Sequence, residues 1–192
     1  MKPLIQTASG NIVNFADPTL STFTLNDIAH GLSNTCRYAG QCKFFYSVAQ
    51  HAVLVSYLAE GGGGAVAGFA GLHHDDTEAF MCDIPTPLKM LIPEYKAIEE
   101  RVHNVIFDRL GLQRTLPPEV VEADGLALAL EKPTLIGVDV IGWNLRDLTH
   151  PSWDEFRAYI KPMTNESAKQ LWLDRHAQIG RASCRERVFR IV

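Results

Sequence analysis

The sequence lacks several features that would assign it to a class at once. Its four cysteines (Cys36, Cys42, Cys82 and Cys184) show no C-x-x-C spacing, which argues against a zinc knuckle or a redox pair. This usage predicts a reduced, cytoplasmic protein. No basic segment followed by an apolar one opens the chain, so we expect no export signal. No apolar run approaches the length of a membrane span, so we expect no membrane partner.

An excess of positive charge is also missing. The chain carries 18 Lys and Arg against 22 Asp and Glu, which gives a net charge of −4. This balance argues against a general surface for a nucleic-acid polymer, although it leaves room for a local basic pocket. The glycines at 61–64 are not followed by Gly-Lys-Ser or Gly-Lys-Thr, so they predict a flexible linker and not a phosphate-binding loop.

The length and composition predict one globular domain with a sizeable core. Hydrophobic residues make up 46% of the chain and charged residues 21%, as in ordinary globular proteins. Residues 179–192 resemble the translation of a common sequencing adapter read in one frame. We therefore expect the domain to cover residues 1–178 and residues 179–192 to be a non-native tail.

Periodic apolar positions predict a succession of helices. We expect long helices over 48–60, 65–74, 95–110, 119–131 and 167–178, and a short one over 27–32. Pro117 and Pro118 suit the start of one of these helices, and Gly111 suits the end of another. Apolar residues on both sides of residues 9–11 predict a small hairpin.

The densest group of ionisable side chains lies within residues 71–89. Two histidines and four carboxylates fall within eleven residues, directly after an apolar run: His73, His74, Asp75, Asp76, Glu78 and Asp83. Burying so many ionisable groups is costly unless something pairs them. A divalent metal is the simplest partner, because neutral imidazole and carboxylate are its ordinary ligands. The alternative is a polar helix end whose acids are solvated.

Three residues elsewhere are further candidates, each with an ordinary alternative. His51 projects from the apolar stripe of helix 48–60, either as a core histidine or as a ligand. Asp124 lies within an apolar helical face and needs a partner there, either a metal or a cation. Arg37 is either a surface charge or a phosphate clamp, since a guanidinium offers paired donors to phosphate oxygens.

The order of these residues resembles the HD-domain metal-dependent phosphohydrolases. One histidine comes from a first helix (His51), an adjacent His-Asp pair from a second (His74 and Asp75), and one aspartate from a much later helix (Asp124). Segments 36–38, 46–51 and 83–89 look like the small 5′-deoxynucleotidase branch of that family. The resemblance covers roughly residues 25–131 and implies an all-α fold, a single helical bundle with the metal site between its helices.

The resemblance also implies a metal-ligand set. His51, His74, Asp75 and Asp124 would hold one divalent ion, and Mn, Co, Zn, Fe and Ni all suit two imidazoles and two carboxylates. Asp139 is the rival of Asp124 as the distal ligand. His73 would lie behind the ligands or in the core, and Asp76 would be a surface acid at the helix end.

The remaining matching positions acquire substrate roles from the same resemblance. Arg37 would orient the phosphate, Glu78 would manage the proton of the attacking water, and Asp83 would hold the sugar hydroxyl. Four more residues would stand beside the substrate: Tyr38, Ile84, Pro85 and Thr86. A deoxynucleotide is thus the expected small-molecule partner. Members of the family are often dimers, so a homodimer is the protein partner that the resemblance suggests.

Several activities compete within this family. A 5′-deoxynucleotidase that releases phosphate from deoxynucleoside monophosphates is the first expectation, and a small phage-type dATP triphosphohydrolase is the alternative. No Gly-Tyr-Pro follows the motif, which disfavours a cyclic-dinucleotide phosphodiesterase, and Ala79 replaces the second acid of alarmone hydrolases. A catalytically silent nucleotide-binding module is the alternative of another class. Loss of a ligand, of Arg37 or of Glu78 would favour it, and none is lost.

Overall fold

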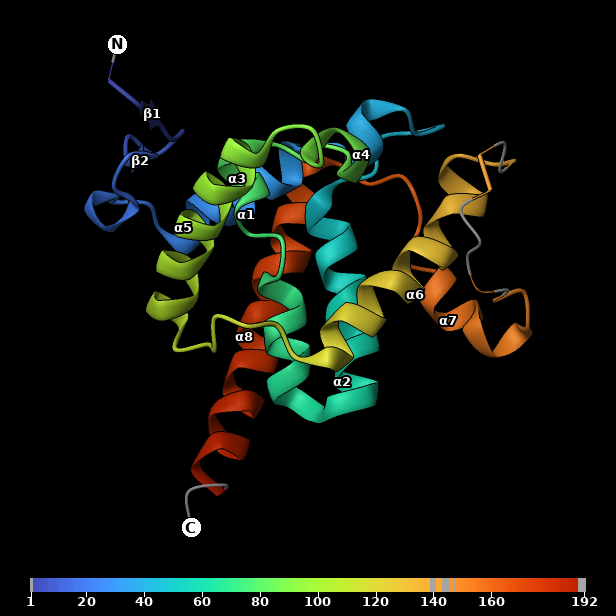
Figure 1. Cartoon of the computed structure of the whole chain (residues 1–192). Coiled ribbons are helices and arrows are strands. Elements are labelled where there is room, and N and C mark those ends of the chain that lie inside the picture. The colour runs from blue at the N-terminus through green and yellow to red at the C-terminus, as the bar shows by residue number, and fades with distance from the viewer. Residues whose placement is uncertain (1, 139–140, 143–145, 147, 190–192) are drawn as a thin grey trace.

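The protein is mostly helical, as expected. A computed structural model describes residues 2–138, 141–142, 146 and 148–189, in which the single sheet is a two-stranded hairpin (Figure 1). The strands are β1 (Leu4–Gln6) and β2 (Ile12–Asn14). The longer helices are α1 (Leu25–Asn34), α2 (Val48–His73), α5 (Pro93–Leu110), α6 (Pro118–Leu135) and α8 (Asn165–Phe189). The short ones are η1 (Pro18–Leu20), η2 (Arg37–Gly40), α3 (Glu78–Met81), α4 (Thr86–Lys89), η3 (Pro151–Trp153) and α7 (Asp154–Arg157).

Helix α2 is the centre of the fold and differs from its predicted form. Its helical structure continues through most of the glycine run, which was expected to be a linker, and breaks at Gly64, where φ is 73° and ψ is −170°. The chain then folds back, so that α2 consists of two antiparallel arms (Figure 1). A left-handed φ is accessible to glycine because it has no Cβ, and Gly64 therefore supplies the bend.

The two arms pack closely because small residues face each other. A Cβ placed on Gly71 would lie 3.1 Å from the Cβ of Ala59, and the Ser56 hydroxyl donates to the carbonyl of Gly68 over 2.8 Å. By length and composition the segment Val48–Met81 could cross a membrane, with a mean hydropathy of 1.3 over its best window. The expectation that no run has this length was therefore wrong. Because 61% of that window is buried in the molecule, as in any core helix, it is weak evidence for a membrane span.

Helices α6 and α8 pack on α2 and divide the interior into two clusters. One cluster lies among α1, α2, α5 and α8 and includes the fully buried Trp172 and Phe107. The other lies between α2, α6 and the segment after it, and includes Leu54 and Leu135. Helix α8 runs past residue 178, and the buried Ile179 belongs to the first cluster.

The N-terminal hairpin has the predicted place, and one carboxylate fastens it to α1. Leu4 pairs with Asn14 across the strands, and the turn contains Gly10 with φ of 88°. Asp27 accepts hydrogen bonds from the Ser9 hydroxyl (2.6 Å), the Asn11 side chain (2.9 Å) and the Thr24 backbone N–H (2.8 Å). These bonds complete the capping box of α1 and hold the hairpin turn against it.

Replacing Asp27 by alanine should therefore destabilise the protein by about 1–2 kcal/mol at pH 7, the usual cost of losing such a cap. Burial acts to raise the pKa of Asp27, but its hydrogen bonds outweigh that effect and hold the pKa well below its usual range. Its stabilisation is thus present above the ordinary pKa of 3.8 and is lost as the pH falls toward the lower folded value. Denaturant unfolding at pH 7 and pH 3 measures the difference.

The control is Asp108→Ala, which removes an exposed carboxylate paired with Arg114 and should change stability much less. If Asp27→Ala lowered the free energy of unfolding equally at pH 7 and pH 3, the ionic origin of the effect would be contradicted.

Candidate metal centre

His51 projects from the first arm of α2 and is completely buried. Ser47 and Gln50 start this arm with a capping box, and His51 follows one position later. The ring nitrogen Nδ1 lies 2.7 Å from Oε1 of Glu131. An ionised carboxylate can only accept a hydrogen bond, so Nδ1 of His51 carries the hydrogen. In the neutral ring, Nε2 then keeps its lone pair.

His74 and Asp75 end the second arm, which returns to the same level as His51. His74 donates from Nδ1 to the carbonyl of Gly71 over 2.8 Å, so its Nε2 also keeps a lone pair in the neutral ring. Oδ2 of Asp75 lies 3.1 Å from Nε2 of His74 and 3.7 Å from Nε2 of His51. The fold-back of α2 thus brings together residues that are more than twenty positions apart.

Helix α6 supplies the distal aspartate. Oδ1 of Asp124 lies 3.2 Å from Nε2 of His51 and 3.9 Å from Nε2 of His74. One ligand atom from each of these three residues lies within 4.8 Å of the others, which is a group that could hold a metal ion. Asp75 borders the same group. Its rival Asp139 lies outside the described residues.

The chemistry of this group fits a divalent ion. Nε2 of His51 and Nε2 of His74 are buried and make no well-formed hydrogen bond among the described residues, although carboxylate oxygens of Asp124 and Asp75 lie 3.2 Å and 3.1 Å away. Buried polar atoms rarely lack a well-formed hydrogen bond. In each ring the other nitrogen is held by an oxygen acceptor, which is the usual support of a metal-binding histidine.

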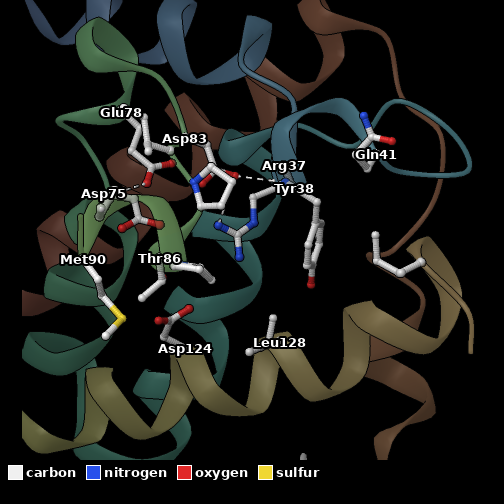
Figure 2. A pocket seen from close by; sticks show the side chains of 15 residues that line it. Arg37, Tyr38, Gln41, Asp75, Glu78, Asp83, Thr86, Met90, Asp124 and Leu128 are labelled. Carbon is white, nitrogen blue, oxygen red and sulfur yellow. Dashed lines mark hydrogen bonds and ion pairs between the residues drawn. The ribbon is translucent and has the colours of Figure 1, made fainter. Parts of the chain in front are cut away.

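A cavity of about 660 Å³ opens beside this candidate metal-binding group (Figure 2). All the predicted substrate residues line it: Arg37, Tyr38, Glu78, Asp83, Ile84, Pro85 and Thr86. Asp75 and Asp124 also face it, and apolar side chains such as Met90, Leu128 and Ile136 cover another part. In Figure 2 the Arg37 guanidinium lies between the carboxylates of Asp75 and Asp124 on one side and the ring of Tyr38 on the other. The cavity therefore has charged and apolar walls, and Met90 lies near Asp75 and Asp124 in Figure 2.

Arg37 and Tyr38 are held by a strained loop. Tyr38 and Ala39 have φ values of 54° and 52°, a left-handed conformation that costs L-residues roughly 1–2 kcal/mol each. The backbone N–H of Tyr38 donates to Oδ2 of Asp83 over 3.1 Å, and the Arg37 guanidinium lies 3.6 Å from the same oxygen. Asp83 therefore ties the loop to the opposite wall of the cavity, and such strain is typical of functional sites.

Glu78 is buried near the carboxylates of Asp75 and Asp83, and its surroundings suit proton transfer. One oxygen lies 3.5 Å from Nζ of Lys89, and the other has no hydrogen-bond partner among the described residues. Burial raises the pKa of Glu78 well above its usual range, and the charges of Asp75 and Asp83 raise it further against the opposing charges of Arg37 and Lys89. A buried carboxyl whose pKa is raised in this way, on the wall of a cavity, is typical of groups that transfer protons in active sites.

One predicted position was wrong, and one contributor was missed. Asp76, expected on the surface, is 1% exposed and lies 2.6 Å from Nδ1 of His73, which is itself buried in the core and 2.9 Å from His176 of α8. The turn after α2 directs Asp76 inward to His73, which in turn contacts α8, and the sequence does not reveal this burial. Glu131 had no predicted role, although an acid two turns after Asp124 on the same helical face was the available signal.

Comparison with known proteins gives relatives but no activity. No protein-family model matches the chain. The uncharacterized protein YfdR of Escherichia coli (strain K12) is 44% identical over 135 residues, which are 70% of this chain and 73% of that protein. The uncharacterized protein RCAP_rcc00048 of Rhodobacter capsulatus is 34% identical over 139 residues, 67% of this chain and 71% of that protein.

Metal affinity should depend steeply on pH. Burial and the Arg37 charge lower the pKa of His51, but Glu131 and Asp124 outweigh them and raise it to about 9. Burial likewise lowers the pKa of His74, whereas Asp75 and Asp124 raise it to about 9. A metal must displace both protons, so Mn²⁺ affinity should rise by up to about 100-fold per pH unit as the pH approaches 9.

Titration of the metal-stripped protein with Mn²⁺ between pH 6 and pH 9 measures this slope, with circular dichroism confirming the fold at each pH. An affinity that levels off just above pH 7 would mean that both imidazoles keep ordinary pKa values near 6.5.

Proposed function

We propose that this chain, which belongs to the family of the Escherichia coli protein YfdR, is a metal-dependent phosphohydrolase of the HD-domain type that acts on deoxynucleotides. Its first proposed activity is that of a 5′-deoxynucleotidase. One observation carries the proposal: two buried imidazole nitrogens that face the carboxylates of Asp75 and Asp124 lie beside a cavity of about 660 Å³ that the Arg37 guanidinium also lines. This combination of ligands and a phosphate-binding cation suits phosphate ester hydrolysis.

A bound metal supplies a Lewis acid and lowers the pKa of water to about 7. His51, His74, Asp75 and Asp124 would hold it. Arg37, whose side chain is only 12% exposed, would orient the phosphate and stabilise the charge that develops on its oxygens. Glu78 would accept the proton of the attacking water, a step typically worth roughly 10²- to 10⁴-fold in rate.

The remaining cavity residues support recognition of a deoxynucleoside. Asp83 is the acceptor on the cavity wall that would take a hydrogen bond from the sugar hydroxyl, and Tyr38 stands beside it. The apolar part, with Met90, Leu128 and Ile136, would cover the base. Such apolar walls with a few polar groups are typical of small-molecule sites.

Electrostatics favours a monophosphate over a triphosphate. The cations on the described cavity wall are Arg37 and Lys89, and each already faces carboxylates: Arg37 lies 3.6 Å from Asp83, and Lys89 lies 2.7 Å from Glu99. A triphosphate brings more negative charge than a monophosphate and would meet no further cation there. Like charges in such a cavity cost binding free energy.

The test of the proposed activity is a panel of deoxynucleoside mono-, di- and triphosphates with ribonucleotide controls, incubated with the metal-loaded protein. We expect free phosphate from the deoxynucleoside monophosphates. Release of intact triphosphate from a dNTP would instead identify a triphosphohydrolase. Binding of nucleotides without turnover, in the presence of any of the five metals, would identify a silent binding module.

Two substitutions separate metal binding from proton transfer. Asp124→Ala should empty the metal site, because it removes one of the grouped ligands. Glu78→Gln should keep the metal and lose roughly 10²- to 10⁴-fold in kcat, because an amide does not accept the proton. Elemental analysis of metal content and steady-state kinetics measure both effects.

Glu122→Gln is the matched control, since Glu122 lies two residues before Asp124 on α6 with an exposed side chain and should change neither quantity. Asp139→Ala tests the rival ligand. If the Asp139→Ala protein contained no metal while Asp124→Ala kept its normal metal content, the assignment of the distal ligand would be reversed. Metal loss in Glu78→Gln would make Glu78 a ligand.

A further inference from the structure

Glu131 is a fully buried carboxylate in a helix whose other buried residues are apolar, apart from the neighbouring Lys132. It lies on α6 with an exposed fraction of 0%, next to the buried Leu130 and two turns after Asp124. A buried ionised group costs several kcal/mol unless partners compensate for it. A purely structural position in the core would be filled more favourably by a leucine or a methionine. The contacts of its two oxygens therefore indicate why an acid is present.

Each oxygen of Glu131 contacts a different half of the site. Oε1 lies 2.7 Å from Nδ1 of His51, on the first arm of α2. Oε2 lies 3.6 Å from the Arg37 guanidinium and accepts a hydrogen bond from the Tyr38 hydroxyl over 3.4 Å. Its partners are 80 to 94 positions away in the chain, on the metal centre and on the strained loop. One side chain thus links the candidate metal ligands to the residues proposed to meet the substrate.

The two metal-centre histidines are oriented by different means. Nδ1 of His74 is held by the backbone carbonyl of Gly71, whereas Nδ1 of His51 is held by the Glu131 carboxylate. Glu131 therefore decides which nitrogen of His51 carries the hydrogen and keeps the lone pair of Nε2 directed toward His74 and Asp124. Removing that acceptor leaves the ring free to rotate or to take the other tautomer.

We infer that Glu131 is a positioning residue that orients His51 for the metal and Arg37 and Tyr38 for the substrate at the same time. The Arg37 and Tyr38 part rests on the proposed function, whereas the His51 part does not. Because both parts share one carboxylate, a change at Glu131 should weaken metal binding and substrate binding together.

Three variants test this role. Glu131→Gln keeps the shape but can present an amide N–H to His51, and Glu131→Asp keeps the charge but withdraws it by one methylene. Glu60→Gln is the control, because it also removes a carboxylate from an ion pair, with Arg175 at 2.7 Å, away from the site. The readouts are Mn²⁺ affinity of the metal-stripped proteins by electron paramagnetic resonance, thermal unfolding, and KM and kcat at saturating Mn²⁺.

We expect Glu131→Gln and Glu131→Asp to bind Mn²⁺ about 10- to 100-fold more weakly than the parent, and Glu60→Gln to bind it equally well. At saturating Mn²⁺, kcat/KM for a deoxynucleoside monophosphate should fall by roughly tenfold in both Glu131 variants, through a higher KM and a lower kcat, because Arg37 loses its support both for orienting the phosphate and for stabilising the charge that develops on it. If Glu131→Gln does not fold, Glu131→Asp carries the test.

Unchanged Mn²⁺ affinity in a folded Glu131 variant would overturn the inference. So would weaker binding in Glu131→Gln alone with normal binding in Glu131→Asp, since that pattern reports charge and not position. If the variants lose Mn²⁺ affinity as expected but the parent hydrolyses no nucleotide, the proposed function fails and the positioning of His51 stands.

Discussion

The close packing of the two arms of α2 is the contact on which the rest of the site depends. Gly68 and Gly71 have no side chain, so the arms approach until Ser56 bonds to the carbonyl of Gly68. A larger residue at either position would meet the facing arm at 3.2 Å or less and force the arms apart. The distance between His51 and the His74–Asp75 pair follows from this packing, since the histidines belong to opposite arms.

The second constraint is charge. Asp75, Asp124 and Glu131 surround two buried imidazoles, and their combined field is strong enough to raise the pKa of both rings to about 9. A site that attracts protons so strongly also attracts a dication, because both relieve the same repulsion between carboxylates. Binding a metal and binding protons are thus alternative ways of stabilising these carboxylates and imidazoles. The fold brings the side chains together before either one binds.

The components of the site were predictable to different degrees. His51 and Asp124 could be selected as candidates because each is an ionisable residue on an apolar helical face, whereas the choice of His74 and Asp75 within residues 73–83 depended on the resemblance to the HD-domain family. Asp76 directly follows Asp75 in the chain, yet its side chain is buried and contacts Nδ1 of His73. Local pattern identifies a residue that needs a partner, but the partner's identity depends on which elements pack against it. For this reason the buried contacts of Glu131 could not be predicted.

The sequence by itself determined the longer helices, the hairpin near the N-terminus and the spacing of the candidate ligands, because hydrophobic period, caps and turns act over a few residues. The tertiary structure alone decided that α2 folds back at Gly64, that the loop around Tyr38 is left-handed and tied to Asp83, and that one carboxylate serves both His51 and Arg37. These features depend on contacts between side chains far apart in the chain. Their free energies arise only when the helices pack together.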